Sequence, residues 1–155
     1  MTWQIGKYLQ RLLRPFFQRI MNSKIFHHEW DFIQKLYRYT YSQQRLTAKT
    51  LFCTIKVSNF YALASHTQLI NAIVYFLQEN VAMNRVEHVL ISTIRNLLQL
   101  FLFNNIFCYE DKIYTITKGS PSTIPLSTTL ADIYLCEWQT KLIRELGGQE
   151  ELFGR

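Results

Sequence analysis

The stretch from Tyr109 to Trp138 limits the possible folds most, because it joins a hairpin pattern, a glycine-proline turn and a long helical period. Two β-rich runs, Ile106–Tyr109 and Ile113–Thr117, flank Asp111-Lys112 and predict an antiparallel hairpin. Lys118-Gly119-Ser120-Pro121 then ends the second strand, since proline keeps the residue before it out of helical geometry. The sequence therefore predicts a hairpin that leads through a tight turn into a helix.

Helical periods dominate the rest of the chain. Apolar residues recur at three- and four-residue spacing after the turn, which predicts one helix face ending at Gly147-Gly148. A similar stripe near the N-terminus contains Pro15, which predicts a kink or a division of that helix. A third amphipathic run covers Trp30–Tyr41. The predicted face of the helix after the turn is Leu126, Leu130, Ile133, Tyr134, Trp138 and Leu142. The predicted face of the N-terminal helix is Tyr8, Leu9, Leu12, Leu13, Phe16 and Ile20, and that of the third run is Trp30, Ile33, Leu36 and Tyr37.

The middle of the chain predicts one strand and two helices. Leu51–Tyr61 begins with a β-rich run and is predicted to be a strand. Ser65-His66-Thr67-Gln68 has the spacing of a capping box, which opens a helix. Asn84 with Glu87 predicts the start of another helix, which Asn104-Asn105 ends.

Composition narrows the class of protein. The 155 residues are 48% hydrophobic and 15% aromatic, which indicates one folded domain, or a piece of one, rather than a disordered chain. Cys53, Cys108 and Cys136 are odd in number and lack metal-ligand spacing, which predicts buried, reduced thiols. No apolar run is long enough to span a bilayer. We therefore expect an intracellular protein without a membrane segment, either nuclear or cytoplasmic.

The run Ile116–Leu135 resembles the second conserved motif of reverse transcriptases, in particular those of the Penelope-like type. Thr123-Ile124 stands where that family carries glycine-serine, and Asp132 stands at its asparagine. In a second register, which needs an insertion, Gly119-Ser120-Pro121 supplies the glycine-serine-proline of the motif. The residues that match without a gap are Gly119, Pro125, Leu126, Ser127, Leu130, Ala131 and Ile133.

The predicted strand Leu51–Tyr61 is similar to the first polymerase motif of the same family. Val57, Phe60 and Tyr61 agree with the pattern, and Tyr61 falls where the family places the aromatic residue beneath the incoming sugar. Lys56 occupies the position of the motif's aspartate. The resemblance thus implies a nucleotide pocket formed by Tyr61, Gly119 and Pro125.

The resemblance also implies that catalysis is lost. The intact family binds paired Mg²⁺ ions through carboxylates of the first motif and of a later aromatic-x-Asp-Asp strand. The ammonium of Lys56 repels Mg²⁺, and the sequence contains no Asp-Asp pair. We expect no retained catalytic residue, no metal site and no cofactor. The resemblance implies a domain truncated before the Asp-Asp motif, with a remnant of that motif encoded beyond Arg155.

These features imply an α+β fold, namely the partial fingers and palm of a right-handed polymerase, mostly helical with a small antiparallel sheet. Residues 1–50 would form a helical fingers-side segment, and residues 51–155 a partial palm with both motifs as one structural unit. The function implied is a reverse transcriptase domain fragment of retroelement origin without polymerase activity. The alternative is a basic α+β module that binds nucleic acid or protein with the same scaffold.

The net charge of +6 favours a polyanionic partner, so RNA or DNA is the expected ligand of any basic surface. Lys7, Arg11 and Arg14 are the candidate contacts, and a solvated helix face is the alternative for the same three cations. Self-association is also expected, because a strand at Leu51–Val57 without its Asp-Asp neighbour would leave an open sheet edge.

Overall fold

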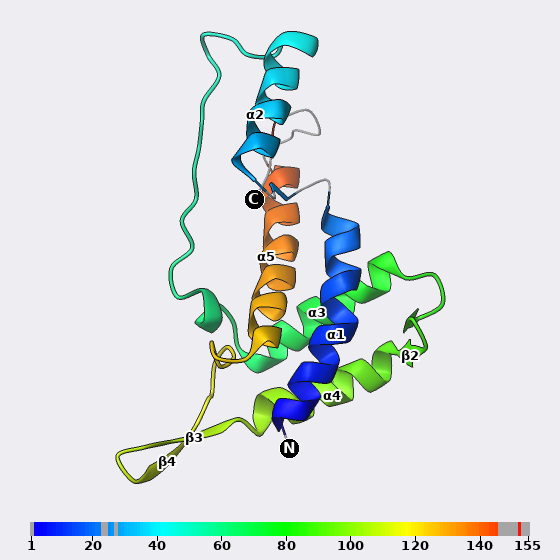
Figure 1. Cartoon of the computed structure of the whole chain (residues 1–155), viewed down its shortest axis with the longest axis vertical. Coiled ribbons are helices and arrows are strands. Elements are labelled where there is room, and N and C mark those ends of the chain that lie inside the picture. Colours follow the sequence, from blue (N-terminus) through cyan, green and yellow to red (C-terminus); the bar gives the residue numbers. More distant parts are fainter. Residues whose placement is uncertain (1, 23–24, 27, 146–151, 153–155) are drawn as a thin grey trace.

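The computed structural model describes residues 2–22, 25–26, 28–145 and 152. The described chain is mostly helical with two small antiparallel sheets, which confirms the coarse α+β expectation. Four helices form its body: α1 (Thr2–Met21), α3 (His66–Asn80), α4 (Ile91–Phe103) and α5 (Pro125–Glu145) (Figure 1).

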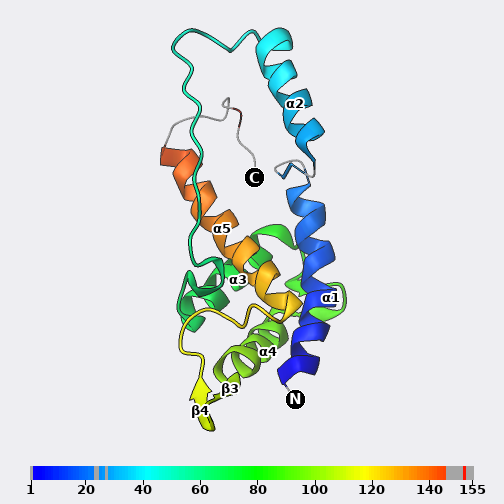
Figure 2. The ribbon, with the colours of Figure 1, turned by 60° about the vertical axis from the view of Figure 1, so that its left-hand side comes forward.

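The body packs as two helix pairs that cross each other. The long helices α1 and α5 lie side by side, and α3 and α4 cross them on one side (Figures 1 and 2). Large apolar side chains from all four helices meet at this crossing and are shielded from water, which is the main source of stability in a helical domain. The most deeply buried are Leu9, Leu13, Phe17, Ile73, Leu77, Ile94, Leu98, Phe101, Leu102, Leu126, Leu130 and Ile133.

Helix α1 confirms the predicted N-terminal stripe but not its division. The helix runs unbroken from Thr2 to Met21 with Pro15 inside it. Tyr8 belongs to the predicted face, yet its side chain is exposed. Gly6 allows the close approach of α4, because a Cβ atom there would lie 2.9 Å from the Phe101 ring.

Polar contacts join the first and last helices alongside the apolar core. Nη1 of Arg14 lies 2.8 Å from Oδ2 of Asp132 in a part-buried ion pair. The Thr129 hydroxyl donates a hydrogen bond of 2.8 Å to Oε1 of Gln10. Directional contacts of this kind fix how α5 is rotated against α1.

The capping box at the start of α3 is confirmed. The Gln68 backbone N–H donates to the Ser65 hydroxyl oxygen at 3.3 Å, and the Ser65 backbone N–H donates to Oε1 of Gln68 at 2.9 Å. The two residues thereby satisfy donors that the helix itself cannot pair.

The predicted helix start at Asn84 is wrong. A short antiparallel hairpin of β1 (Arg85–Val86) and β2 (Val89–Leu90) occupies this place, and α4 begins only at Ile91. The hairpin buries both Val86 and Val89 against the core, so tertiary packing overrides the local capping signal. The predicted end at Asn104-Asn105 is confirmed, since α4 ends at Phe103.

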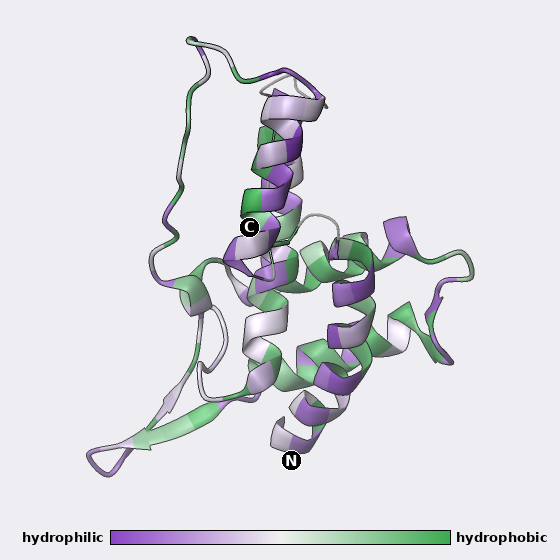
Figure 3. Cartoon of the chain, turned by 45° about the horizontal axis from the view of Figure 1, so that its top comes forward, coloured by the Kyte–Doolittle hydropathy of each residue, from purple (hydrophilic) through white to green (hydrophobic). Residues whose placement is uncertain are grey.

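The predicted second hairpin is confirmed with a shift of one residue. Strand β3 (Ile106–Tyr109) pairs with β4 (Lys112–Thr115) around the turn Glu110-Asp111. Both turn residues have positive φ, +48° and +59°, as the tight turns of two-residue hairpins require. All eight strand residues are exposed, and the hairpin projects from the body with one hydrophobic strand, a more polar second strand and a hydrophilic tip (Figure 3).

The predicted amphipathic run at Trp30 forms α2 (Glu29–Tyr37), which continues as the π-helix η1 (Arg38–Ser42). Its predicted apolar face is not covered, because Trp30, Ile33 and Tyr37 are all exposed. The apolar spacing of residues 30–41 therefore predicted the helix correctly, but these three side chains do not join the core of the described chain.

The predicted strand Leu51–Tyr61 is not formed. Residues 51–58, here called the arm, follow an extended course up to a bend at Ser58 (Figure 1). Side chains of α2 and Leu152 line a pocket with residues 51–55, but no backbone hydrogen bond links the arm to another described residue. A strand exists only with a hydrogen-bonded neighbour, and the described chain places none beside the arm. A 3₁₀ turn, η2 (Phe60–Ala62), then leads toward α3.

The predicted long helix is confirmed as α5, which begins one residue early at Pro125. Proline suits a first helical position, where the missing N–H has no partner to lose. Of its predicted face, Leu126, Leu130 and Ile133 are buried, whereas Trp138 is exposed. The predicted stop at Gly147-Gly148 lies outside the described residues.

Candidate functional site

The two motif-like segments meet at one place, here called the loop junction, which comprises η2 with residues 63–66 and the turn 118–121. The Gly119 N–H donates to the Ala64 carbonyl at 2.9 Å, and the Ser120 N–H donates to the Tyr61 carbonyl at 3.0 Å. Ser65 and Lys118 form an isolated antiparallel β-bridge beside them. Backbone bonds therefore hold the entry to α3 against the turn that precedes α5.

Gly119 is required for this contact. Its φ of +73° lies in the left-handed region, where side chains other than hydrogen are strained. A Cβ atom would also lie 1.9 Å from the Tyr61 carbonyl oxygen and 2.7 Å from the Ala62 Cα. Both neighbours are backbone atoms, so the clash cannot be relieved by a side-chain rotation.

His66 seals the inner side of the loop junction. Its side chain is 4% exposed and packs edge-on against Phe103, with ring centroids 5.0 Å apart. Burial lowers the pKa of His66 below its ordinary value of 6.5, and a hydrogen bond with the Gly119 backbone opposes that shift. Its Nε2 is buried without a hydrogen-bond partner. The neutral imidazole is therefore the form that this packing favours.

The structure brings together two of the three expected nucleotide-pocket residues. Tyr61 and Gly119 are in backbone contact, and the Tyr61 ring is partly exposed. Pro125 lies at the first turn of α5 with its ring exposed, beyond the turn that includes Ile124. The role of these residues as a nucleotide pocket stays a prediction.

The site does not fit the paired Mg²⁺ ions of the intact family. Lys56, which the resemblance aligns with a metal-binding aspartate, is exposed on the arm, and its ammonium cannot bind Mg²⁺. Within the described ranges, no three His, Cys, Asp or Glu side chains lie close enough together to hold a metal ion.

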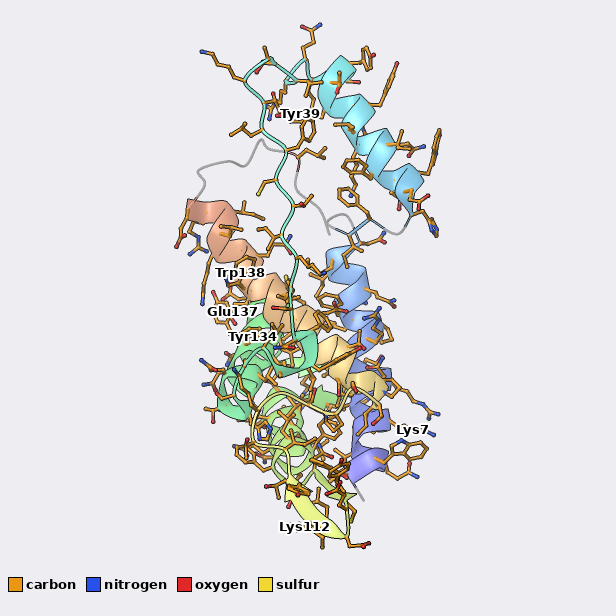
Figure 4. The ribbon with its side chains drawn as sticks, turned by 90° about the vertical axis from the view of Figure 1, so that its left-hand side faces the viewer. Lys7, Tyr39, Lys112, Tyr134, Glu137 and Trp138 are labelled. Carbon is orange, nitrogen blue, oxygen red and sulfur yellow. The ribbon has the colours of Figure 1, made fainter. Side chains whose placement is uncertain are left out.

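The three cations expected to contact nucleic acid have different surroundings. The Lys7 ammonium lies 3.6 Å from the centre of the Trp3 ring and points away from the body (Figure 4). Arg14 is paired with Asp132 and serves the α1–α5 contact. Arg11 is exposed. Their role in binding stays a prediction.

Sequence reasoning missed a second surface, on α2 and η1. Tyr37 and Tyr41 are 62% and 66% exposed, and their rings lie together with centroids 4.6 Å apart. Arg38 lies between them in the chain and is exposed. The signal was present in the sequence, because between Asp31 and Glu79 the chain carries five Lys and Arg residues and no acid.

No family model, curated protein or solved structure matches this chain. None of the helices that the described residues form is long and apolar enough to cross a bilayer.

Replacing Gly119 with alanine should destabilise the protein by at least about 1–3 kcal/mol, the usual strain of a side chain at positive φ, with the Tyr61 clash added. Urea unfolding of G119A and wild type measures the difference. Ser122→Ala is the matched control, because Ser122 is exposed in the adjoining turn and should change little. Equal stability of G119A and wild type would contradict the junction geometry.

The free energy of unfolding should fall as the pH drops below 6.5. The unfolded chain protonates His66 at its ordinary pKa, whereas the folded chain resists protonation until the pH reaches its lowered pKa. One such proton contributes a slope of at most about 1.4 kcal/mol per pH unit. Denaturant titrations across this range should give a flatter slope for His66→Phe, while His88→Gln, a change at an exposed histidine, should keep the wild-type slope.

Proposed function

We propose that this chain is a reverse transcriptase domain fragment of retroelement origin that does not polymerise nucleotides. The observation that carries the proposal is the loop junction, where the end of the first motif-like segment and the start of the second are hydrogen-bonded. Tyr61 and Gly119, expected in one pocket by resemblance, are adjacent there although they are far apart in the chain.

The order of the helices and of the second hairpin supports the proposal. Two helices lie between the two segments, with a short hairpin (β1–β2) between them and a second hairpin (β3–β4) after them, and a long helix follows the second segment. Lys56 explains the proposed loss of activity, because an ammonium cannot replace a metal-binding carboxylate. The arm is unpaired where a palm would have a sheet strand, which suits a scaffold that no longer assembles a polymerase site.

The purified chain should incorporate no nucleotide on a primed RNA or DNA template with Mg²⁺ or Mn²⁺. An intact reverse transcriptase in the same assay is the positive control. Lys56→Asp should remain inactive, since one restored carboxylate leaves the Asp-Asp pair missing. Template-dependent extension by the wild-type chain would contradict the proposal.

The second candidate is a nucleic-acid-binding module, and the surface of α2 and η1 favours it. Exposed tyrosine rings stack on unpaired bases, and neighbouring arginines contact phosphates. Tyr37→Ser with Tyr41→Ser should weaken binding of single-stranded RNA if the surface is used, by roughly 1–3 kcal/mol for each stacked base. Lys7→Gln with Arg11→Gln tests the α1 face in the same titration and spares the Arg14 ion pair.

A further inference from the structure

The arm has the features of a strand without a sheet. Its backbone is extended, and none of the residues that the structure describes pairs with it. Leu51, Phe52 and Ile55 are exposed along it, with Leu51 at 91%. Apolar and β-branched residues on an unpaired extended backbone favour the addition of another strand.

The hairpin of β3 and β4 has free strand edges that could pair with an additional strand. A two-stranded hairpin is only marginally stable in water, and a third strand is the usual remedy. Its apolar side chains are exposed, including Ile106, Tyr109 and Ile113. The β3–β4 pairing uses one edge of each strand, so each keeps an outer edge with backbone donors and acceptors.

The arm and the hairpin leave the loop junction in opposite directions. In Figures 1 and 2 the arm rises toward α2, whereas the hairpin descends from the other side of the junction. Figure 4 shows the same arrangement, with Tyr39 beyond the far end of the arm and Lys112 near the hairpin tip. One chain therefore does not pair its own arm with its own hairpin.

A second copy removes this obstacle. The arm and the hairpin lie roughly along one line, on opposite sides of the loop junction (Figures 1 and 2). A two-fold axis perpendicular to that line places the arm of one copy where it meets the hairpin of the other. The hairpin of each copy then lies along the arm of the other, and the same contact is made twice. Such an isologous arrangement is closed and leaves neither arm unpaired.

The charges near each strand indicate which edge of the hairpin the arm would pair with. The arm contains Lys56 and follows Lys49, whereas β3 runs into the acidic turn Glu110-Asp111. Strand β4 instead begins with Lys112, and a lysine on an edge strand opposes pairing with another basic segment. The β3 edge is therefore the better partner for a basic arm.

We propose that two copies of this chain associate by reciprocal strand addition, in which residues 51–58 of each copy extend the hairpin of the other along its β3 edge. This inference does not depend on a reverse transcriptase origin, because it rests on the unpaired arm, the exposed hairpin and their opposite directions.

Two native cysteines report the proposed contact. The predicted burial is confirmed for Cys136 but is wrong for Cys53 and Cys108, because Cys53 lies on the unpaired arm and Cys108 on the projecting strand β3, and both are exposed. A short bis-maleimide cross-linker at low protein concentration should give a covalent dimer, with Cys53 of one copy joined to Cys108 of the other in peptide mass spectra. Cys53→Ser and Cys108→Ser should each abolish that dimer. No covalent dimer, or one joined only through identical cysteines, would overturn the proposal.

Sedimentation of the uncross-linked chain tests the backbone pairing. The average mass of the wild type should rise with concentration toward twice that of one chain. Thr54→Pro removes a backbone donor from the arm and should keep the protein monomeric. Ala48→Pro is the matched control. The Thr50 N–H donates to the Thr47 carbonyl and closes a turn in which Ala48 is the second residue, a position that accepts proline. A monomeric wild type, or a T54P variant that dimerises equally well, would refute the pairing.

Discussion

The contact of Gly119 with the backbone of Tyr61 and Ala62 is the constraint on which much of this structure depends. It leaves no room for a side chain, and two backbone hydrogen bonds hold the adjacent residues. Because α3 and α5 both start within a few residues of the contact, their relative placement is decided there. The arm and the hairpin also leave from this point, so the same contact sets their directions.

The polymerase interpretation rests on arrangement and not on chemistry. The motif-like segments supply a glycine turn, an aromatic residue and a long helix, and the loop junction joins them. The metal-binding groups of the family are absent from these segments, since Lys56 is an exposed ammonium. Under the proposed origin, the backbone geometry, which depends on few residue types, would outlast the carboxylates, which depend on single positions.

Local signals in the sequence predicted local structure well. The capping box of Ser65 and the hairpin around Glu110-Asp111 are complete within a few residues, and both are confirmed. The arm was predicted wrongly because pairing of a strand depends on a distant partner that residues 51–58 do not reveal. The start at Asn84 failed because burial of Val86 and Val89 outweighed the capping pattern.

Contacts across the chain could not be foreseen from spacing. The ion pair of Arg14 with Asp132 joins α1 to α5, and the spacing of the cations on the first helix gives no sign of it. The resemblance placed Tyr61 and Gly119 in one pocket, but only the structure shows the backbone hydrogen bonds between their segments. Exposure of Trp30 and Tyr37 was equally hidden, since an amphipathic period does not say whether a partner exists.

The pairing of α1 with α5 has a consequence for synthesis of the chain. Arg14 and Asp132 are 118 residues apart, so the ribosome completes α1 well before it makes the part of α5 that packs against α1. During that interval its apolar side, including Leu9 and Leu13, lacks this cover, and such surfaces recruit chaperones or aggregate. Translation speed and chaperone supply thus become determinants of yield that the finished fold conceals.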